Sequence, residues 1–309
     1  MTTSDDRGTT SDTTVKIPTV KIPTEIVTIS TVEELRSVLT AHRCAGRDIG
    51  FVPTMGFLHD GHASLMRAAA ADNDVVVASI FVNPLQFAPD EDLDDYPRDL
   101  VRDTALAEAA GVHYLFTPNR DQMYPIKPVA TTINVGGLSE GLEAATRPTH
   151  FGGVATVVTK LFSIVGTCTA YFGEKDYQQL AIISRMVIDL SLPVMIVGCP
   201  IIRETDGLAM SSRNTYLEGA DRKAATVLRR ALDIGIASIE DGERDPDLVM
   251  ADMAAVIMEE PLAGLDYVAV VDSASLEQPE TLSGEIRLLI AAQVGRPRLI
   301  DNCGVTVPE

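Results

Sequence analysis

The chain has 309 residues, 46% of them hydrophobic and 22% charged, and a formal net charge of −19. This length suggests two domains, and the apolar fraction excludes a wholly disordered chain. No apolar run approaches the ~18–20 residues of a membrane-spanning helix, and the excess of acidic residues argues against a nucleic-acid-binding protein.

Residues 1–24 differ in composition from the rest of the chain. They are rich in Ser, Thr and Asp, and the segment TVKIP at 14–18 is repeated at 19–23. We expect a disordered tail, with a targeting or docking role as the alternative. Neither a secretory signal nor a CxxC pair is visible, and the four cysteines are scattered. These observations favour a cytoplasmic location.

Residues 25–201 alternate between short strands and helices, so we expect right-handed βαβ units in a doubly wound parallel sheet. The nearly continuous apolar run DVVVASIFV is typical of a strand that is covered on both faces. Ligands of such sheets bind at the carboxyl ends of the strands. Strands are predicted at 49–52, 74–82, 113–116, 169–172 and 194–197, and helices at 32–42, 61–71, 100–110, 154–165 and 176–190.

Residues 202–309 have a different pattern, which predicts a smaller C-terminal α+β domain. An apolar stripe predicts an amphipathic helix over 220–240, and a second helix is expected over 247–259. Strands are predicted at 267–271, 286–293 and 298–301, the last two forming a hairpin.

The strongest local signal is the segment PTMGFLHDGH at 53–62, between a predicted buried strand and an Ala-rich helix. A strand that ends at a glycine turn before a helix presents backbone N–H groups and a positive dipole to an anion. His59 and His62 are one helical turn apart, so both rings can face the same cavity, and Gly61 lets the backbone approach a bound anion closely. We therefore expect a nucleotide site in which both imidazoles donate to a phosphate and stabilise developing charge.

Two other interpretations of the histidines remain open. Zinc ligation would need a third ligand, and none is evident near this pair, which also lacks the i, i+4 spacing of metalloprotease motifs. Alternatively, one histidine caps the helix and the other packs in the core.

Three further segments carry polar groups that suit the same site. In DGLAMSSRN, at 206–214, Ser211, Ser212 and Arg213 can bind a triphosphate, although a helix N-cap with a surface Arg is the simpler interpretation. In YFGEKDYQQL, at 171–180, Gly173 permits close contact and Lys175 supplies charge, and the alternative is a solvated turn. In SIFVNPLQF, at 79–87, Asn83 and Gln86 follow a buried strand and can orient a polar substrate.

With these motifs and RPTHFGG at 147–153, the chain resembles the pantothenate synthetase (pantoate–β-alanine ligase) family of the HxGH nucleotidyltransferase superfamily. The resemblance implies a Rossmann-like fold and a homodimer. It also implies ligation of pantoate and β-alanine to pantothenate, through a pantoyl adenylate, with release of AMP and pyrophosphate from ATP.

The resemblance also assigns site residues. His62 matches the proton donor, Gln86 and Gln179 match pantoate contacts, and Gln86 also lies near β-alanine; Asn83 joins this substrate set. The ATP site comprises Met55, Gly56, His59, Gly61, His62, Gly173, Lys175, Asp176, Ile202, Met210, Ser211, Ser212 and Arg213. Family enzymes need Mg²⁺. Asp103 is a candidate for an acidic residue near that ion, but its surroundings depart from the family pattern, so no metal ligand is assigned.

The chemistry of the motifs agrees with this assignment. A carboxylate that attacks an α-phosphate brings two anions together, so His59, His62, Lys175 and Arg213 are expected to supply positive charge within an acidic protein. The second domain is expected to act as a lid that keeps water from the adenylate. Alternatives are an adenylyltransferase acting on a phosphate ester, an aminoacyl-tRNA synthetase, and a nucleotide-binding regulatory module without turnover.

Overall fold

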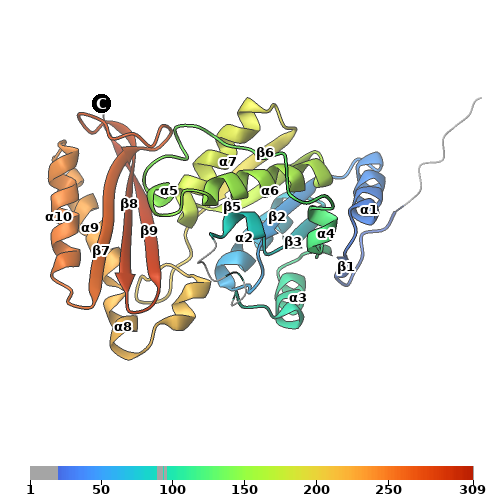
Figure 1. Cartoon of the computed structure of the whole chain (residues 1–309), viewed down its shortest axis with the longest axis horizontal. Coiled ribbons are helices and arrows are strands. Elements are labelled where there is room, and N and C mark those ends of the chain that lie inside the picture. Colours follow the sequence, from blue (N-terminus) through green and yellow to red (C-terminus); the bar gives the residue numbers. More distant parts are fainter. Residues whose placement is uncertain (1–19, 89–92, 94–95, 309) are drawn as a thin grey trace, which may run out of the picture.

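The computed structural model describes residues 20–88, 93 and 96–308. Within them, parallel strands form a six-stranded sheet in the order β1-β4-β3-β2-β5-β6, and an antiparallel sheet has the order β7-β8-β9 (Figure 1). This arrangement confirms the predicted fold class, a Rossmann-like parallel sheet with a smaller C-terminal α+β part.

The first sheet contains the predicted strands and one further strand, β1, that the sequence pattern does not predict. Its strands are β1 (Val27–Ile29), β2 (Ile49–Thr54), β3 (Val75–Ile80), β4 (Tyr114–Phe116), β5 (Cys168–Gly173) and β6 (Val194–Cys199). The helices with it are α1 (Val32–Cys44), α2 (Asp60–Asp72), α3 (Leu100–Ala109), α4 (Arg120–Met123), α5 (Glu143–Thr146), α6 (His150–Val165) and α7 (Tyr177–Asp189). Two 3-10 turns, η1 (Pro84–Gln86) and η2 (Glu174–Asp176), follow β3 and β5.

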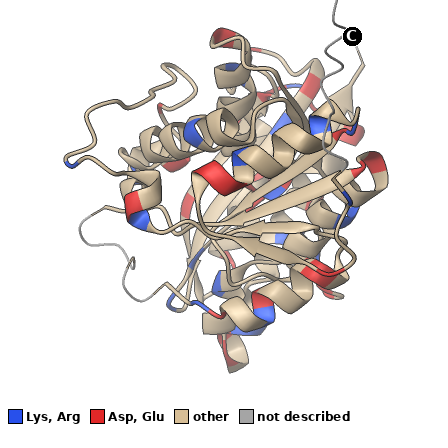
Figure 2. Ribbon diagram, turned by 90° about the vertical axis from the view of Figure 1, so that its right-hand side faces the viewer, with Lys and Arg blue, Asp and Glu red and all other residues tan. Residues whose placement is uncertain are grey.

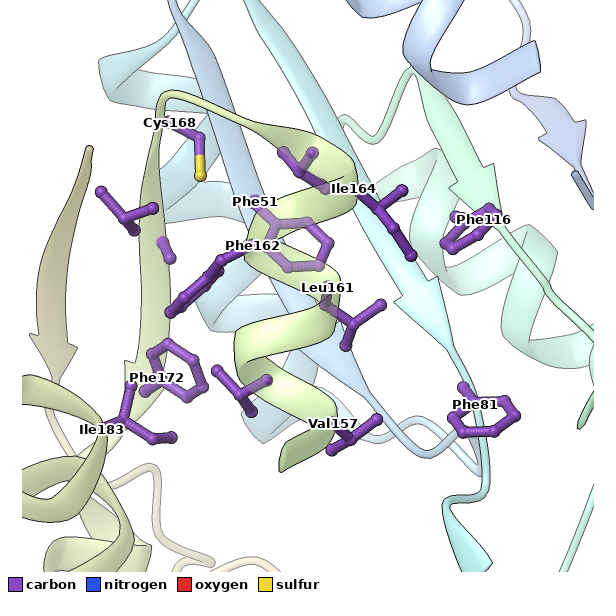
Figure 3. Packing of buried hydrophobic residues seen from close by; sticks show 14 of the residues in the cluster. Phe51, Phe81, Phe116, Val157, Leu161, Phe162, Ile164, Cys168, Phe172 and Ile183 are labelled. Carbon is purple, nitrogen blue, oxygen red and sulfur yellow. The ribbon is translucent and has the colours of Figure 1, made fainter. Parts of the chain in front are cut away.

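Helices cover both faces of this sheet, as the continuous apolar strands require. Helices α1, α6 and α7 contribute to one hydrophobic cluster, and α2 and α3 contribute to another on the opposite face. Phe162 of α6 packs edge-on between Phe51 and Phe172, with ring centroids 6.4 and 6.3 Å apart (Figure 3). This packing joins α6 to the two central strands, β2 and β5.

The order of the strands creates a crevice between β2 and β5. From β2 the chain passes through α2 to β3 on one side, whereas from β5 it passes through α7 to β6 on the other. The segments that follow these two neighbouring strands therefore diverge. Open α/β sheets bind their ligands at such a switch point.

The second sheet comprises β7 (Ala263–Asp272), β8 (Gly284–Val294) and β9 (Arg298–Val307), and the β8–β9 hairpin confirms the prediction. Helices α9 (Val227–Glu240) and α10 (Pro246–Met258) lie on its outer side in Figure 1. Preceding them are η3 (Ser212–Tyr216) and α8 (Gly219–Ala224). The single helix predicted over 220–240 is wrong, because a turn separates α8 from α9. There the Thr226 hydroxyl donates to the Lys223 carbonyl, which competes with helical bonding.

Most of the predicted disordered tail, residues 1–19, lies outside the described residues. The carbonyl of Val20 accepts a hydrogen bond from Arg47, and Ile22 packs against the first hydrophobic cluster. Among the described residues, no helix has the length and apolar character needed to cross a bilayer. On the face shown in Figure 2, basic residues lie among acidic ones.

Candidate active site

A cavity of about 250 Å³ lies at the carboxyl ends of β2 and β5. It brings together most residues that the sequence assigned to one site, from four separate segments. These are Met55, His59, Gly61, His62, Gln86, Gly173, Lys175, Asp176, Gln179, Ile202, Met210, Ser211, Ser212 and Arg213. Two predicted residues, Gly56 and Asn83, do not line this cavity.

The histidines belong to a hydrogen-bonded turn at the start of α2. His59 is the N-cap, and its Nδ1 accepts from the Gly61 N–H at 3.1 Å, while His62 Nδ1 accepts from the His59 N–H at 3.3 Å. An Nδ1 that accepts leaves the proton of a neutral ring on Nε2. Each imidazole therefore both caps the helix and has an Nε2–H donor. Gly61 is required here, because a Cβ would lie 2.9 Å from the His59 ring.

Both rings are neutral in the free protein at pH 7, which corrects the expectation that they supply positive charge. Burial is the main cause, and it lowers the pKa of His59 to about 4 and that of His62 to about 3. Nearby Lys175 lowers the pKa of both rings further, and His59 also lowers the pKa of His62. The histidines can thus act as neutral donors, and the positive charge of the site comes from Arg147, Lys175 and Arg213, which all line the cavity.

Residues 55–62, which we call the α2 turn, are held by hydrogen bonds with side chains of α3. Asp103 is 1% exposed, and its two oxygens accept the N–H groups of Phe57 and Leu58, each at 2.7 Å. Arg102 donates to the Leu58 carbonyl at 3.1 Å and stacks on the Phe57 ring. Gly56 has a φ of 86°, which allows the turn. No local pattern indicates this role of Asp103, because the contacts join segments 45 residues apart.

Gln86 reaches the cavity from η1, and Asn83 orients it. The Asn83 amide donates to Gln86 Oε1 at 3.2 Å and to the Gly153 carbonyl at 3.1 Å, and its oxygen accepts from the Tyr124 hydroxyl. Asn83 is therefore a buried support of η1, and Gln86 is the residue that lines the cavity. A Cβ on Gly153 would lie 2.6 Å from Gln86 Cα and would also clash with the Leu85 carbonyl.

The lysine enters on η2, directly after β5. Gly173 has a β-region backbone, and no atom lies within 4 Å of where its Cβ would be, so this position leaves open space beside the cavity. Lys175, Asp176 and Gln179 line the cavity from this side. Their neighbour Gln178 points away and anchors the preceding loop through bonds with the carbonyls of Leu138 and Gly141.

Residues 203–213, which we call the serine loop, complete the cavity. The loop is closed at its base by a β-bridge between Arg203 and Ala209, and the Met210 N–H donates to the Ile202 carbonyl at 2.9 Å. Ser211 caps η3 by accepting the Arg213 N–H at 3.2 Å, as one sequence interpretation expected, and it also lines the cavity.

A second cavity, of about 300 Å³, extends the crevice toward the C-terminal sheet. It shares Lys175, Asp176, Gln179, Ser211 and Arg213 with the first. Its far wall contains Arg298, which forms an ion pair with Glu143 at 2.6 Å, and Tyr267, whose hydroxyl donates to the same carboxylate at 2.9 Å. The two sheets therefore face each other across one continuous crevice.

The described residues contain no group of three or more His, Cys, Asp or Glu side chains that could hold a metal ion. The zinc interpretation of His59 and His62 thus finds no third ligand there. The pair is suited instead to donating hydrogen bonds to an anion.

The chain is also similar to known proteins. Residues 27–304 match the sequence model of a family described as pantoate-beta-alanine ligase. A pantothenate synthetase of Heliobacterium modesticaldum is 53% identical over 279 residues, which cover 90% of this chain and 99% of that protein.

Solved structures give the same result. The crystal structure of a pantothenate synthetase from Thermus thermophilus superimposes with a TM-score of 0.84 at 46% identity, covering 90% of this chain and 98% of that one. A pantoate-beta-alanine ligase from Francisella tularensis, crystallised with beta-gamma ATP and beta-alanine, has a TM-score of 0.74 at 33% identity. That comparison covers 90% of this chain and 97% of the other.

Proposed function

Because this chain belongs to the pantoate–β-alanine ligase family, we propose that its crevice is where pantoate and β-alanine are joined at the expense of ATP. The observation that carries this proposal is the convergence of four segments on one cavity between β2 and β5. The reaction forms pantoyl adenylate and pyrophosphate, and the amine of β-alanine then displaces AMP to give pantothenate.

The first step needs groups that stabilise the charge that builds up on the phosphates. The α2 turn presents the two Nε2–H donors, and Lys175 and Arg213 flank the same cavity with fixed charges. Ser211 and Ser212 add short neutral donors. Donors that are already oriented cost no reorganisation as the anhydride breaks. His62 is our candidate for the proton donor, and its neutral ring would donate a hydrogen bond through the Nε2–H.

Pantoate would lie against Gln86 and Gln179, which reach the cavity from η1 and from α7. The amide of Gln86 is held by Asn83, so its orientation is fixed before substrate arrives. No enzyme nucleophile is needed, because the adenylate is itself the activated acyl group.

We propose the division into residues 25–201 as the nucleotide-binding part and 202–309 as a lid. The second cavity, between η2 and the C-terminal sheet, is where such a lid would exclude water from the adenylate. The ion pair between Arg298 and Glu143 lies at this boundary.

Magnesium fits this site as an ion carried by the nucleotide, because Mg²⁺ is usually bound by substrate phosphates, waters and one or two carboxylates. Asp176 lines the cavity and could supply a carboxylate. Asp103 does not fit, because it is 1% exposed, supports the α2 turn and does not line this cavity. When bound, the ion would neutralise phosphate charge.

We also propose a homodimer in the cytoplasm. Strand β6 forms one edge of the first sheet; its Met195 is 62% exposed, and Ile188 of the preceding helix α7 is 72% exposed. An edge strand with exposed apolar side chains favours pairing with a second copy. The four free cysteines fit a reducing compartment. Sedimentation equilibrium tests the assembly, and a purely monomeric protein at micromolar concentration would contradict it.

The test of the site is pyrophosphate release in the presence of ATP and pantoate, and AMP release on adding β-alanine, omitting each substrate in turn. Lys175→Met is expected to slow pyrophosphate release by about 10²–10³-fold, as loss of one transition-state donor commonly does. Lys223→Met, on the exposed surface of α8, is the control. Release that does not depend on pantoate, or full activity of Lys175→Met, would contradict the proposal.

A further inference from the structure

Two adjacent residues of β9, Asp301 and Asn302, lie between the two segments that carry the charged groups of the crevice. Both side chains are buried, with 3% and 1% exposure. They come from the C-terminal sheet, yet their contacts are with η2 and with the base of the serine loop. No part of the proposed reaction uses them directly.

Asn302 holds the turn that carries Lys175. Its Nδ2 donates to the carbonyl of Glu174 at 3.0 Å and to the carbonyl of Lys175 at 2.8 Å. Because both partners are acceptors, only the NH₂ side of the amide can face them. Asn302 therefore fixes the two consecutive peptide groups on either side of the Lys175 Cα.

Asp301 holds the base of the serine loop through Arg203. The carboxylate accepts from Arg203 Nη1 at 2.6 Å and from Nη2 at 2.9 Å, a bidentate pair. Arg203 also donates to the Gly207 carbonyl at 3.0 Å and is paired with Ala209 in the β-bridge. The loop that leads to Ser211 and Arg213 thus depends on this carboxylate for its anchor.

The two anchors are linked to each other. Asp301 Oδ1 accepts the N–H of Asn302 at 2.7 Å, and Arg203 Nη2 also donates to the Asn302 carbonyl at 3.3 Å. A second contact reinforces η2, since Arg287 of β8 forms an ion pair with Glu174 at 2.9 Å and lies 3.6 Å from the Tyr177 ring centre. One short stretch of β9 therefore sets the position of both loops.

We infer that Asn302 and Asp301 are positioning residues for adenylate formation, which place Lys175 and the Ser211–Arg213 segment at the separation that a triphosphate requires. This inference rests on the proposed function of the crevice. A displacement of about 1 Å at groups that orient a substrate can cost on the order of 10²-fold in rate. Both residues also line the second cavity, and we assign their effect on adenylate formation to the two loops that they hold.

The test is a double-mutant cycle between Asn302→Leu and Lys175→Met, measured as pantoate-dependent pyrophosphate release. Leu has a similar size and no donor. Asn302→Leu alone is expected to lower kcat by roughly tenfold or more. In the Lys175→Met background the same change should have little further effect, because the group it positions is already gone. The matched control is Thr306→Val, on the same strand as Asn302, which removes an exposed hydrogen bond to Glu285 of β8.

The outcomes separate the two proposals. Equal effects of Asn302→Leu with and without Lys175 would mean that Asn302 only stabilises the fold, and would overturn the inference. If Asn302→Leu does not fold, Asn302→Asp keeps the shape but loses both donors, and wild-type kcat in that variant would also overturn it. A wild-type protein without pantoate-dependent release would instead refute the function.

Discussion

The α2 turn and η1, on the side of the first sheet, are held by direct hydrogen bonds and by close packing against neighbouring segments. The serine loop, on the other side of the crevice, is held mainly by ion pairs. Asp103 binds two consecutive N–H groups of the α2 turn, and Gly153 presses against the backbone of η1. The serine loop relies on Arg203 and on Arg222, which bridges Glu204 and Asp206. We call the α2 turn and η1 the rigid side of the crevice. The adjustable side is the part of the serine loop that Arg222 holds through partly exposed ion pairs, whereas the buried pair of Arg203 with Asp301 fixes the base of the same loop.

The largest expected effect is on the rigid side. Asp103→Asn replaces a carboxylate that accepts two N–H groups with an amide that accepts one and presents an NH₂ to the other. We expect a loss of about 1–3 kcal/mol in the free energy of unfolding, and a slower first half-reaction because the histidine donors shift. Asp99→Asn is the control, since Asn can also cap α3. Equal urea midpoints of the two variants would show that the α2 turn does not depend on α3.

Two neighbouring glycines of α6 test the second rigid support. Gly153→Ala places a methyl against the Leu85 carbonyl and Gln86 Cα, so the KM for pantoate should rise by roughly tenfold. Gly152→Ala meets only the Ile133 carbonyl at 3.8 Å and should leave KM unchanged. Both changes have the same effect on helix propensity, so steady-state kinetics isolates the contact. A normal KM for pantoate in Gly153→Ala would mean that η1 shifts to accommodate the added methyl group without moving Gln86 from its position.

The α2 turn should also make stability depend on pH. Because the folded pKa of His59 is about 4, the unfolded chain binds a proton that the folded protein does not as pH falls below about 6.5. Stability present above pH 6.5 is then lost toward pH 4, by on the order of 1–2 kcal/mol at pH 5 from this residue. His59→Asn keeps an N-cap without a titrating group. Thermal unfolding should show a smaller drop between pH 7.5 and 5 in that variant than in the wild type.

The smallest effect is expected on the adjustable side. Arg222→Gln removes two partly exposed ion pairs, which together contribute no more than about 1 kcal/mol. The KM for ATP should rise severalfold with little change in kcat, because the serine loop is tethered less firmly. Arg185→Gln, which removes an exposed ion pair on α7, is the control. A large fall in kcat would place the serine loop among the rigid elements instead.

Local patterns predict the parts of this molecule that local forces determine. Continuous apolar runs locate the strands of the first sheet, and the turn chemistry at residues 53–62 locates a helix start and an anion site. The edge strand β1 escapes prediction because it is three residues long and mostly exposed. The break between α8 and α9 escapes it because the apolar stripe continues across the turn.

The sequence predicts which residues form the site better than it predicts their charge or the direction of their side chains. The motifs bring fourteen residues to one cavity, but they suggest that the histidines are cations, since burial cannot be read from a motif. They also suggest that Asn83 contacts substrate, because its spacing from Gln86 does not show which of the two points into the cavity. Asp103 and Asn302 bond to residues that are 45 and 128 positions away in the sequence, so no local pattern predicts their roles.

The pairing of β2 with β5 has a consequence for how the protein is made. Gly50 pairs with Thr169, so a loop of roughly 120 residues must close before the two halves of the crevice meet. Such distant pairings give a high contact order and slow folding. During synthesis on a ribosome, the α2 turn emerges long before β5, and β5 emerges long before Asn302 of β9. The crevice can therefore reach the geometry described above only after β9 has been made and has packed against η2.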